Sequence, residues 1–258
     1  PEELSLKRKS QLMSGRPPVY DRQALKLTDK DHLNFEKMGK KAHWRFKLIH
    51  EDVSWKDLVR GNCNYHMSSL SDPVIMREDG KPIYTLASVI DDIDHEITHI
   101  IRGEDHVTNS AAQIQLFEAL GKNPPILGHL SLLSGSEGEG LSKRIGSLSL
   151  GSLKEKNIEN ISVVSLLSSI GTSESIVPLS NMTSIIEKFD IKKFSRNTAK
   201  FGIQELYQIN QKILQNYSFA EVEEKLKKIE PNVSEEFWNN VKGNIDTIEE
   251  VKIWINVA

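Results

Sequence analysis

The chain has 258 residues, of which 38% are hydrophobic and 27% are charged, and its formal net charge is −3. This composition is typical of a globular protein with a buried core, with room for one large or two ordinary domains. It holds no run of about eighteen apolar residues and begins with no apolar stretch, so we expect neither a membrane-spanning helix nor a signal peptide. Its single cysteine, Cys63, excludes a disulfide within the chain, and we expect a cytoplasmic protein.

The first 90 residues predict one helix followed by strands. Residues 2–13 have the polar composition of a short surface helix, which Gly15 ends. Four strands are expected to follow, the last two forming a hairpin around a turn at Asp79-Gly80: 42–52, 58–67, 73–77 and 83–90.

The middle of the chain predicts a strand–helix–strand unit. Residues 97–102 form a short apolar run that is typical of a buried strand. A helix over 109–120 begins at the capping residue Asn109 and is closed by Gly121. Residues 127–133 then predict a second strand. Two strands that are separated by one helix at this spacing favour a parallel sheet.

The pattern becomes helical from about residue 152 onward. Apolar residues there recur at the spacing of a helix that buries one face. Two capping boxes, Ser184 with Glu187 and Ser218 with Glu221, are each expected to open a helix, and a further helical pattern follows Ser234. The chain is therefore expected to combine an α/β portion with a helical portion that follows it.

A polar loop with several glycines lies between these portions and carries Lys143 beside Arg144. A closing loop that brings cations to a triphosphate stabilises the charge that develops on phosphate oxygens in the transition state. The loop sequence, residues 140–144, therefore suggests ATP chemistry. An exposed basic turn without a function is the alternative.

Arg102 is the second residue that suggests a function. It stands at the carboxyl end of a predicted strand, which is where ligands bind in open α/β sheets. A guanidinium in that place can hold a carboxylate with two parallel hydrogen bonds. The alternative is a structural ion pair between Arg102 and Asp91, Asp92 or Glu104.

Three strings together resemble the glutamyl-tRNA synthetase family of class I aminoacyl-tRNA synthetases. They are residues 84–92, residues 97–106 with the sequence ITHIIRGEDH followed by the helix pattern over 109–121, and residues 142–144 with the sequence Ser-Lys-Arg followed by Gly146. The resemblance covers nearly the whole chain. It implies an α/β fold, namely the second half of a class I Rossmann-type catalytic domain with part of the acceptor-binding insertion, followed by a helical domain. The implied divisions are 1–72 for the insertion, 73–150 for the catalytic half and 151–258 for a helical stem-contact domain.

The resemblance also implies roles for single residues. Residues 140–144 match the KMSKS loop of the family, although Gly140 stands where that motif has its first lysine. ATP binding is implied for Leu141, Ser142 and Lys143, and stabilisation of phosphate charge for the catalytic pair Lys143 and Arg144. Binding of glutamate and its adenylate is implied for Tyr84, Ser88, Arg102 and His106.

The other motif of the family, HIGH, does not occur in the printed sequence. We therefore expect this chain to be a fragment that also lacks the anticodon-binding domain and is inactive by itself. Some relatives carry zinc in the insertion. Here Cys63 and His66 have the spacing of two ligands without a second pair, so no zinc is expected.

The resemblance implies ATP-dependent attachment of glutamate to tRNA through glutamyl-adenylate in the full-length protein, with Mg²⁺ accompanying ATP. The expected partners are glutamate and a glutamate or glutamine tRNA. Two basic segments, 37–47 and 188–200, are expected to contact tRNA phosphates. A monomer without a membrane partner is expected. The alternatives are a glutamyl-Q-type tRNA-modifying paralogue, against which the long helical portion argues, and a non-catalytic RNA-binding or protein-binding module.

Overall fold

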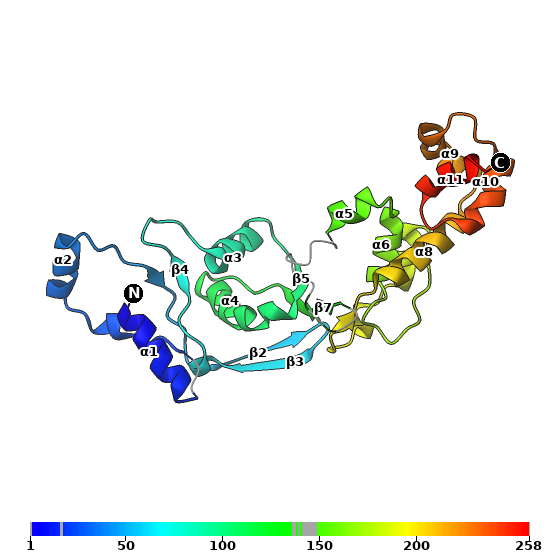
Figure 1. The fold of residues 1–258 in the computed structure, drawn as a ribbon. Helices are drawn as coiled ribbons and strands as arrows, with labels where there is room; N and C mark the ends of the chain where they lie inside the picture. The colour runs from blue at the N-terminus through cyan, green and yellow to red at the C-terminus, as the bar shows by residue number, and fades with distance from the viewer. Residues whose placement is uncertain (1, 16–17, 136–137, 139, 141–148, 258) are drawn as a thin grey trace. The chain divides into compact units, whose positions relative to one another are not determined.

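The computed structural model describes residues 2–15, 18–135, 138, 140 and 149–257 (Figure 1). The chain divides into two compact units, Pro1–Leu130 and Ser131–Ala258, and each has hydrophobic clusters of its own. No helix in the described part combines the length and the apolar character that crossing a membrane requires.

The first unit combines short helices with three small sheets. Its elements are α1 (Glu2–Met13), α2 (Asp29–Lys37), β1 (Trp44–Arg45), β2 (Asp52–Asp57), β3 (Gly61–His66), β4 (Val74–Met76), α3 (Tyr84–Asp94), β5 (His99–Gly103), α4 (Val107–Ala119) and β6 (Ile126–Leu130). β1 pairs with β4, and β2 forms an antiparallel hairpin with β3. Gly61 opens β3 with φ at 72°, a left-handed conformation that glycine adopts at little cost in this tight turn. The helix predicted over 2–13 is confirmed.

The predicted strand–helix–strand unit is confirmed as β5, α4 and β6. The expected cap at Asn109 is wrong, because α4 begins at Val107 and Asn109 lies inside the helix. The two strands are parallel, and Arg102 on β5 lies opposite His129 on β6. α4 buries nearly all of its length, with Ala111 and Ile114 packed against Leu48 from the segment before β2. The expectation of a fully buried β5 is wrong, because the sheet has two strands only and the strand remains partly exposed.

The hairpin predicted over 73–90 is wrong in its second half. The turn at Asp79-Gly80 occurs, with the Arg77 N–H donating to the Lys81 carbonyl, but residues 84–94 form the helix α3. Val89 and Ile93, four residues apart, pack against the same cluster as Phe117 of α4. A helix places such residues on one face, and this burial against α4 overrides the strand-like composition. Figure 1 shows α3 and α4 side by side.

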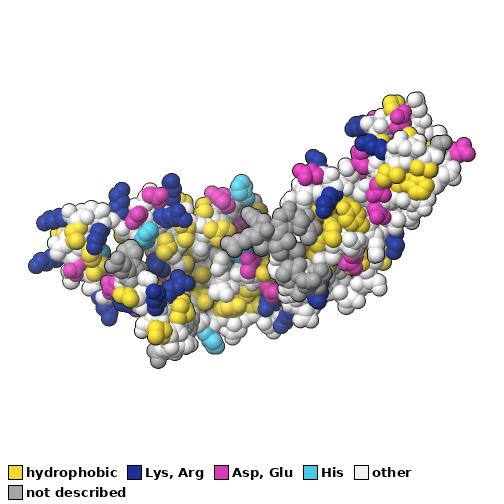
Figure 2. Space-filling view, viewed as in Figure 1, with side chains coloured by type: hydrophobic (Ala, Val, Ile, Leu, Met, Phe, Trp, Pro, Cys, Tyr) yellow, Lys and Arg dark blue, Asp and Glu magenta, His cyan; other side chains and the backbone are white. Residues whose placement is uncertain are grey.

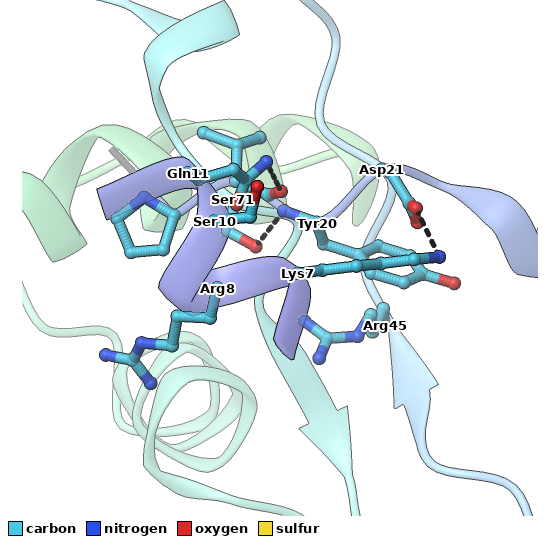
Figure 3. A pocket seen from close by; sticks show the side chains of 10 residues that line it. Lys7, Arg8, Ser10, Gln11, Tyr20, Asp21, Arg45 and Ser71 are labelled. Carbon is cyan, nitrogen blue, oxygen red and sulfur yellow. Dashed lines mark hydrogen bonds and ion pairs between the residues drawn. The ribbon is translucent and has the colours of Figure 1, made fainter. Parts of the chain in front are cut away.

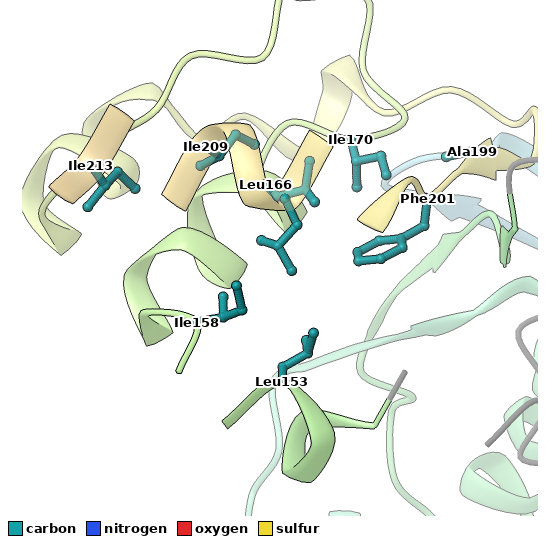
Figure 4. Packing of buried hydrophobic residues seen from close by; sticks show 9 residues of the cluster. Leu153, Ile158, Leu166, Ile170, Ala199, Phe201, Ile209 and Ile213 are labelled. Atoms are coloured by element: carbon teal, nitrogen blue, oxygen red, sulfur yellow. The ribbon is translucent and has the colours of Figure 1, made fainter. Parts of the chain in front are cut away.

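The second unit is mainly helical, as the sequence predicts. Its elements are β7 (Leu133–Ser134), α5 (Leu150–Glu155), α6 (Asn160–Leu167), α7 (Met182–Lys188), β8 (Ala199–Lys200), α8 (Ile203–Asn216), α9 (Phe219–Ile229), α10 (Glu235–Val241) and α11 (Val251–Ile255). One core gathers around Leu166, Phe201 and Ile213 (Figure 4). A second core surrounds Trp238, which is fully buried.

One of the two capping boxes predicted in this unit is confirmed. Ser218 and Glu221 form the predicted capping box of α9, and the Ser234 side chain accepts the Phe237 N–H at the start of α10. The capping box predicted at Ser184 is wrong. The Asn181 side chain caps α7 instead, by accepting the Ser184 N–H at 2.8 Å.

Candidate functional site

Four residues predicted to line a pocket lie close together in the first unit. Tyr84 and Ser88 stand one turn apart on α3, so both project from the same side of that helix. Arg102 lies near the carboxyl end of β5, and His106 ends the single helical turn that follows it. The chain therefore brings one helix face and one strand end to a single place.

The Arg102 guanidinium connects these elements. It donates from Nη1 to the Tyr84 hydroxyl at 3.1 Å. From Nη2 it donates to Ser110 Oγ and Gln113 Oε1, at 2.6 Å each. Its Nε donates toward His129 Nε2 at 3.4 Å. Three of the four acceptors are uncharged groups, and the fourth, His129, accepts only as a neutral imidazole. They orient the guanidinium, and none of them is a carboxylate that would neutralise its charge.

The other two predicted residues join this network through short contacts. Ser88 Oγ accepts a hydrogen bond from Gln113 Nε2 at 2.7 Å. The ring of His106 lies 5.4 Å from that of Tyr84, and its Nδ1 is 3.5 Å from the Tyr84 hydroxyl. Tyr84 remains 50% exposed, whereas Gln113 is buried. The site thus has a buried polar floor and an aromatic side that is open to solvent.

The structural ion pair that could have explained Arg102 is not observed among the described residues. Glu104 binds Arg60 instead, with 2.6 Å between Nη1 and Oε2. Asp92 makes no ion pair with Arg102; burial raises the pKa of Asp92, and the nearby Arg102 charge opposes that rise. Arg102 has five N–H donors and uses four of them in these hydrogen bonds. The remaining hydrogen, on Nη1, has no protein acceptor among the described residues.

Two functional candidates were missed from the sequence. Asp57, the last residue of β2, and His129 of β6 are both buried, and Asp57 Oδ2 lies 2.5 Å from His129 Nδ1. On its other side His129 Nε2 lies 2.7 Å from Ser110 Oγ. These residues are 72 positions apart, so no local pattern could have joined them.

The protonation of this pair follows from its surroundings. Burial raises the pKa of Asp57, but hydrogen bonds from the Arg60 backbone, His129 and the Val59 backbone outweigh it and lower the pKa overall. Burial lowers the pKa of His129, the Asp57 carboxylate opposes this, and Arg102 adds to the lowering. At neutral pH the pair is therefore an ionised carboxylate beside a neutral imidazole.

The residues predicted to bind ATP lie outside the described part of the chain. These are Leu141, Ser142, Lys143 and Arg144. Gly140, just before them, forms a single antiparallel bridge with Ser134. The ATP contacts therefore stay predictions.

A cavity of about 620 Å³ lies between α1 and the following segment, residues 18–21 (Figure 3). Lys7 lines it but is bound to Asp21 at 2.9 Å, and Arg45 lies 4.5 Å over the ring of Tyr20. The predicted pocket residues lie elsewhere, so this cavity is distinct from the candidate site.

In the part of the chain that the structure describes, no three His, Cys, Asp or Glu side chains are grouped for a metal ion. Of the two residues with ligand spacing, His66 binds Asp52 through Nδ1 at 2.7 Å, and Cys63 lies opposite Trp55 in the hairpin. The expectation of no zinc stays a prediction.

A family model described as class I tRNA synthetases (E and Q), catalytic domain, matches residues 1–208 of the chain. The chain belongs to this family. Its α/β architecture is that of the class I synthetase catalytic domain, as the resemblance implied.

Individual members of the synthetase family are similar over almost the whole chain. Glutamate–tRNA ligase 1 of Maricaulis maris is 48% identical over 98% of this chain and 57% of its own length. Glutamate–tRNA ligase 2 of Rickettsia canadensis is 44% identical over 100% of this chain and 58% of its own length. The chain thus spans a little more than half the length of the curated relatives it matches.

Solved structures of the synthetase family agree with the fold. A glutamate tRNA ligase from Elizabethkingia meningosepticum, in complex with its amino acid, superposes with a TM-score of 0.80 at 26% identity, covering 99% of this chain and 58% of that chain. Glutamate-tRNA synthetase from Elizabethkingia anophelis has a TM-score of 0.78 at 25% identity, covering 97% of this chain and 58% of that chain.

Proposed function

We propose that the protein containing this chain activates glutamate with ATP and transfers it to tRNA as a glutamate–tRNA ligase. The observation that carries the proposal is Arg102, a cation held by neutral partners beside an open aromatic side. Because no described carboxylate pairs with it, its charge is available for an anionic ligand. Glutamate is such a ligand, and the curated relatives are named for it.

The four predicted site residues would each have a different role in binding the amino acid. Arg102 would bind a glutamate carboxylate, and the Tyr84 hydroxyl, which already accepts from Arg102, would fix the direction of the guanidinium. His106 would close the aromatic side. Ser88, which accepts from Gln113, would face the ligand from the same helix as Tyr84.

The phosphate chemistry belongs to the loop at 140–144 in this proposal. Leu141, Ser142 and Lys143 would bind ATP, and Lys143 with Arg144 would stabilise charge on the phosphates as pyrophosphate leaves. Magnesium, when bound with ATP, would neutralise part of the phosphate charge.

Transfer RNA would contact exposed basic side chains in both units. The segments 37–47 and 188–200 expose the basic residues Lys37, Lys40, Lys41, Arg45, Lys47, Lys188, Lys192, Lys193, Arg196 and Lys200. Figure 2 shows Lys and Arg side chains spread over the N-terminal helices on the face in view. Phosphate contacts of this kind orient the RNA without reading its sequence. We assign 1–72 to the acceptor-binding insertion, 73–150 to the catalytic half and 151–258 to the stem-contact domain.

The test is glutamate-dependent exchange of labelled pyrophosphate into ATP, with the protein at its natural length. Exchange with glutamate, and none with aspartate or glutamine, is the expected result. A second assay measures attachment of labelled glutamate to glutamate and glutamine tRNA separately. Pyrophosphate exchange that does not depend on glutamate would contradict the proposal.

A further inference from the structure

The candidate site rests on a buried pair, Asp57 and His129, whose side chains are not exposed to a ligand. Asp57 and His129 are 3% and 0% exposed, respectively. The pair joins the end of β2 to the middle of β6, and His129 Nε2 then faces both Ser110 Oγ and Arg102 Nε. A chain of contacts therefore runs from Asp57 through one imidazole to the guanidinium.

The partners of His129 select one of its two neutral tautomers. An ionised Asp57 carboxylate can only accept, so the proton of the ring must be on Nδ1. Arg102 Nε–H can only donate, so Nε2 must present its lone pair. Ser110 fits either state, since its hydroxyl accepts from Arg102 Nη2 and can donate to Nε2 or to the His106 carbonyl.

The Asp57 carboxylate is held in one orientation by several hydrogen bonds, so it can in turn orient His129. Its Oδ1 accepts the backbone N–H groups of Val59 and Arg60 within the hairpin turn, and that of His129 across to β6, all at 3.0–3.1 Å. Its Oδ2 accepts from Trp55 Nε1 at 3.3 Å in addition to the imidazole. These five hydrogen bonds offset the free-energy cost of burying the carboxylate.

The charged and titratable groups around the imidazole are few. Asp57 faces it from β2, and Arg102 faces it from β5, while Arg60 in the hairpin turn adds a more distant positive charge. Arg60 is bound to Glu104, which follows β5. A neutral imidazole thus lies between the Asp57 carboxylate and the Arg102 guanidinium.

We propose that Asp57, acting through His129, positions the Arg102 guanidinium for its carboxylate ligand. Asp57 and His129 are positioning residues, because both are buried and act on the ligand only through Arg102. The inference rests on the proposed function only for the identity of the ligand, a glutamate carboxylate. The positioning itself is a property of this chain and can be measured without a reaction.

The informative substitution is Asp57→Asn. Its amide oxygen can keep the three backbone hydrogen bonds, whereas its NH₂ group then faces His129 Nδ1 and donates to it. The ring proton must move to Nε2, where it meets the Arg102 Nε–H and removes that acceptor. Shape and volume stay nearly unchanged. The hydrogen bond between residue 57 and His129 is reversed, the Arg102 Nε–H loses its acceptor, and the new NH₂ group meets the Trp55 Nε1–H that Oδ2 had accepted.

The first measurement uses the unliganded 258-residue chain and nitrogen-15 NMR of its histidine and arginine side chains. We expect His129 to be the Nδ1–H tautomer at neutral pH and the Arg102 Nε–H to exchange slowly with water. In Asp57→Asn we expect the Nε2–H tautomer and faster exchange of the Arg102 Nε–H. A wild-type His129 that is cationic or carries its proton on Nε2 would overturn the proposal.

The second measurement is glutamate activation by the protein at its natural length. Asp57→Asn should raise the glutamate KM on the order of tenfold, with a smaller change in kcat and in the KM for ATP. The matched control is Asp72→Asn. Asp72 is equally buried in the same unit and binds Arg22 through both oxygens at 2.7 and 2.8 Å, away from the pocket.

The control separates positioning from general loss of stability. Asp72→Asn should lower the melting temperature as Asp57→Asn does, yet leave the His129 tautomer and the glutamate KM as they are. Equal changes of KM in both variants, or an unchanged KM after a demonstrated tautomer reversal, would overturn the proposal. Wild-type protein that does not activate glutamate would instead contradict the proposed function. The NMR measurement would still test the positioning of Arg102 independently of that result.

Discussion

At the scale of single residues, the geometry of Arg102 matters more than its charge. It spreads hydrogen bonds from three nitrogens over four acceptors, which an ammonium group on a flexible stem cannot reproduce. Arg102→Lys should therefore weaken the hold on a carboxylate by about 1.5–3 kcal/mol, which raises the glutamate KM about tenfold to a hundredfold. The KM for ATP should stay nearly constant.

The melting temperature of Arg102→Lys, measured on the same preparation, serves as its control. A lowered melting temperature with a normal glutamate KM would mean that Arg102 supports the scaffold only. The sequence left that alternative open as an ion pair with Asp91, Asp92 or Glu104, and no such pair occurs among the described residues.

Lys143 supports a prediction that depends on the sequence alone. Loss of a cation that meets charge in the transition state typically costs about 3 kcal/mol, on the order of a hundredfold in rate. Lys143→Ala should slow single-turnover formation of the adenylate by that factor and weaken ATP binding much less. An unchanged single-turnover rate would remove Lys143 from the mechanism.

The buried histidine predicts how stability depends on pH. Burial keeps His129 neutral in the folded state, whereas the unfolded chain takes up a proton near the ordinary pKa of about 6.5. The unfolded state therefore binds more protons as pH falls through that value, and the folded state loses stability toward acid. His129→Asn cannot titrate, so the gap in melting temperature between the two proteins should narrow from pH 7.5 to 5.5. A constant gap would contradict the assignment.

At the scale of elements, two residues are candidates for the N-cap of α7, namely Asn181 and Ser184. The Asn181 side chain accepts the Ser184 N–H, so Asn181→Ala should cost about 1 kcal/mol in the free energy of unfolding. Ser184→Ala is the matched control and should change stability little, although the sequence suggested Ser184 as the cap. Urea unfolding of both variants compares them directly. A larger loss for Ser184→Ala would contradict the observed cap.

At the scale of the whole molecule, the second unit should fold by itself from Ser131 onward. Leu133, in β7, packs against the core around Phe201, and β7 pairs with β8. A segment 131–258 should therefore show helical circular dichroism and cooperative unfolding. The shorter segment 152–258 loses β7 and the first residues of α5, so it should unfold at lower urea concentration. Equal urea midpoints for the two segments would show that β7 does not contribute to the stability of the second unit.

Elements with a local pattern could be predicted from the amino-acid sequence. The helix at 2–13, the parallel strands around α4 and the helices of the second unit follow from apolar spacing, capping residues and glycines. Arg102 was also found in this way, since its position after an apolar strand marks a ligand-binding edge. The cap of α7 was missed by three residues, because Asn181 and Ser184 are both suitable capping residues and only the backbone decides between them.

The helix α3 and the buried pair beneath the candidate site depend on contacts between residues far apart in the sequence. Residues 83–90 are rich in strand-forming side chains, yet burial of Val89 against Phe117 of α4 makes the segment helical. Asp57 and His129 meet because a hairpin tip packs on a strand 72 residues later. Local spacing carries no information on such a contact, since the free energy that fixes it comes from burial and hydrogen bonds made after the elements assemble.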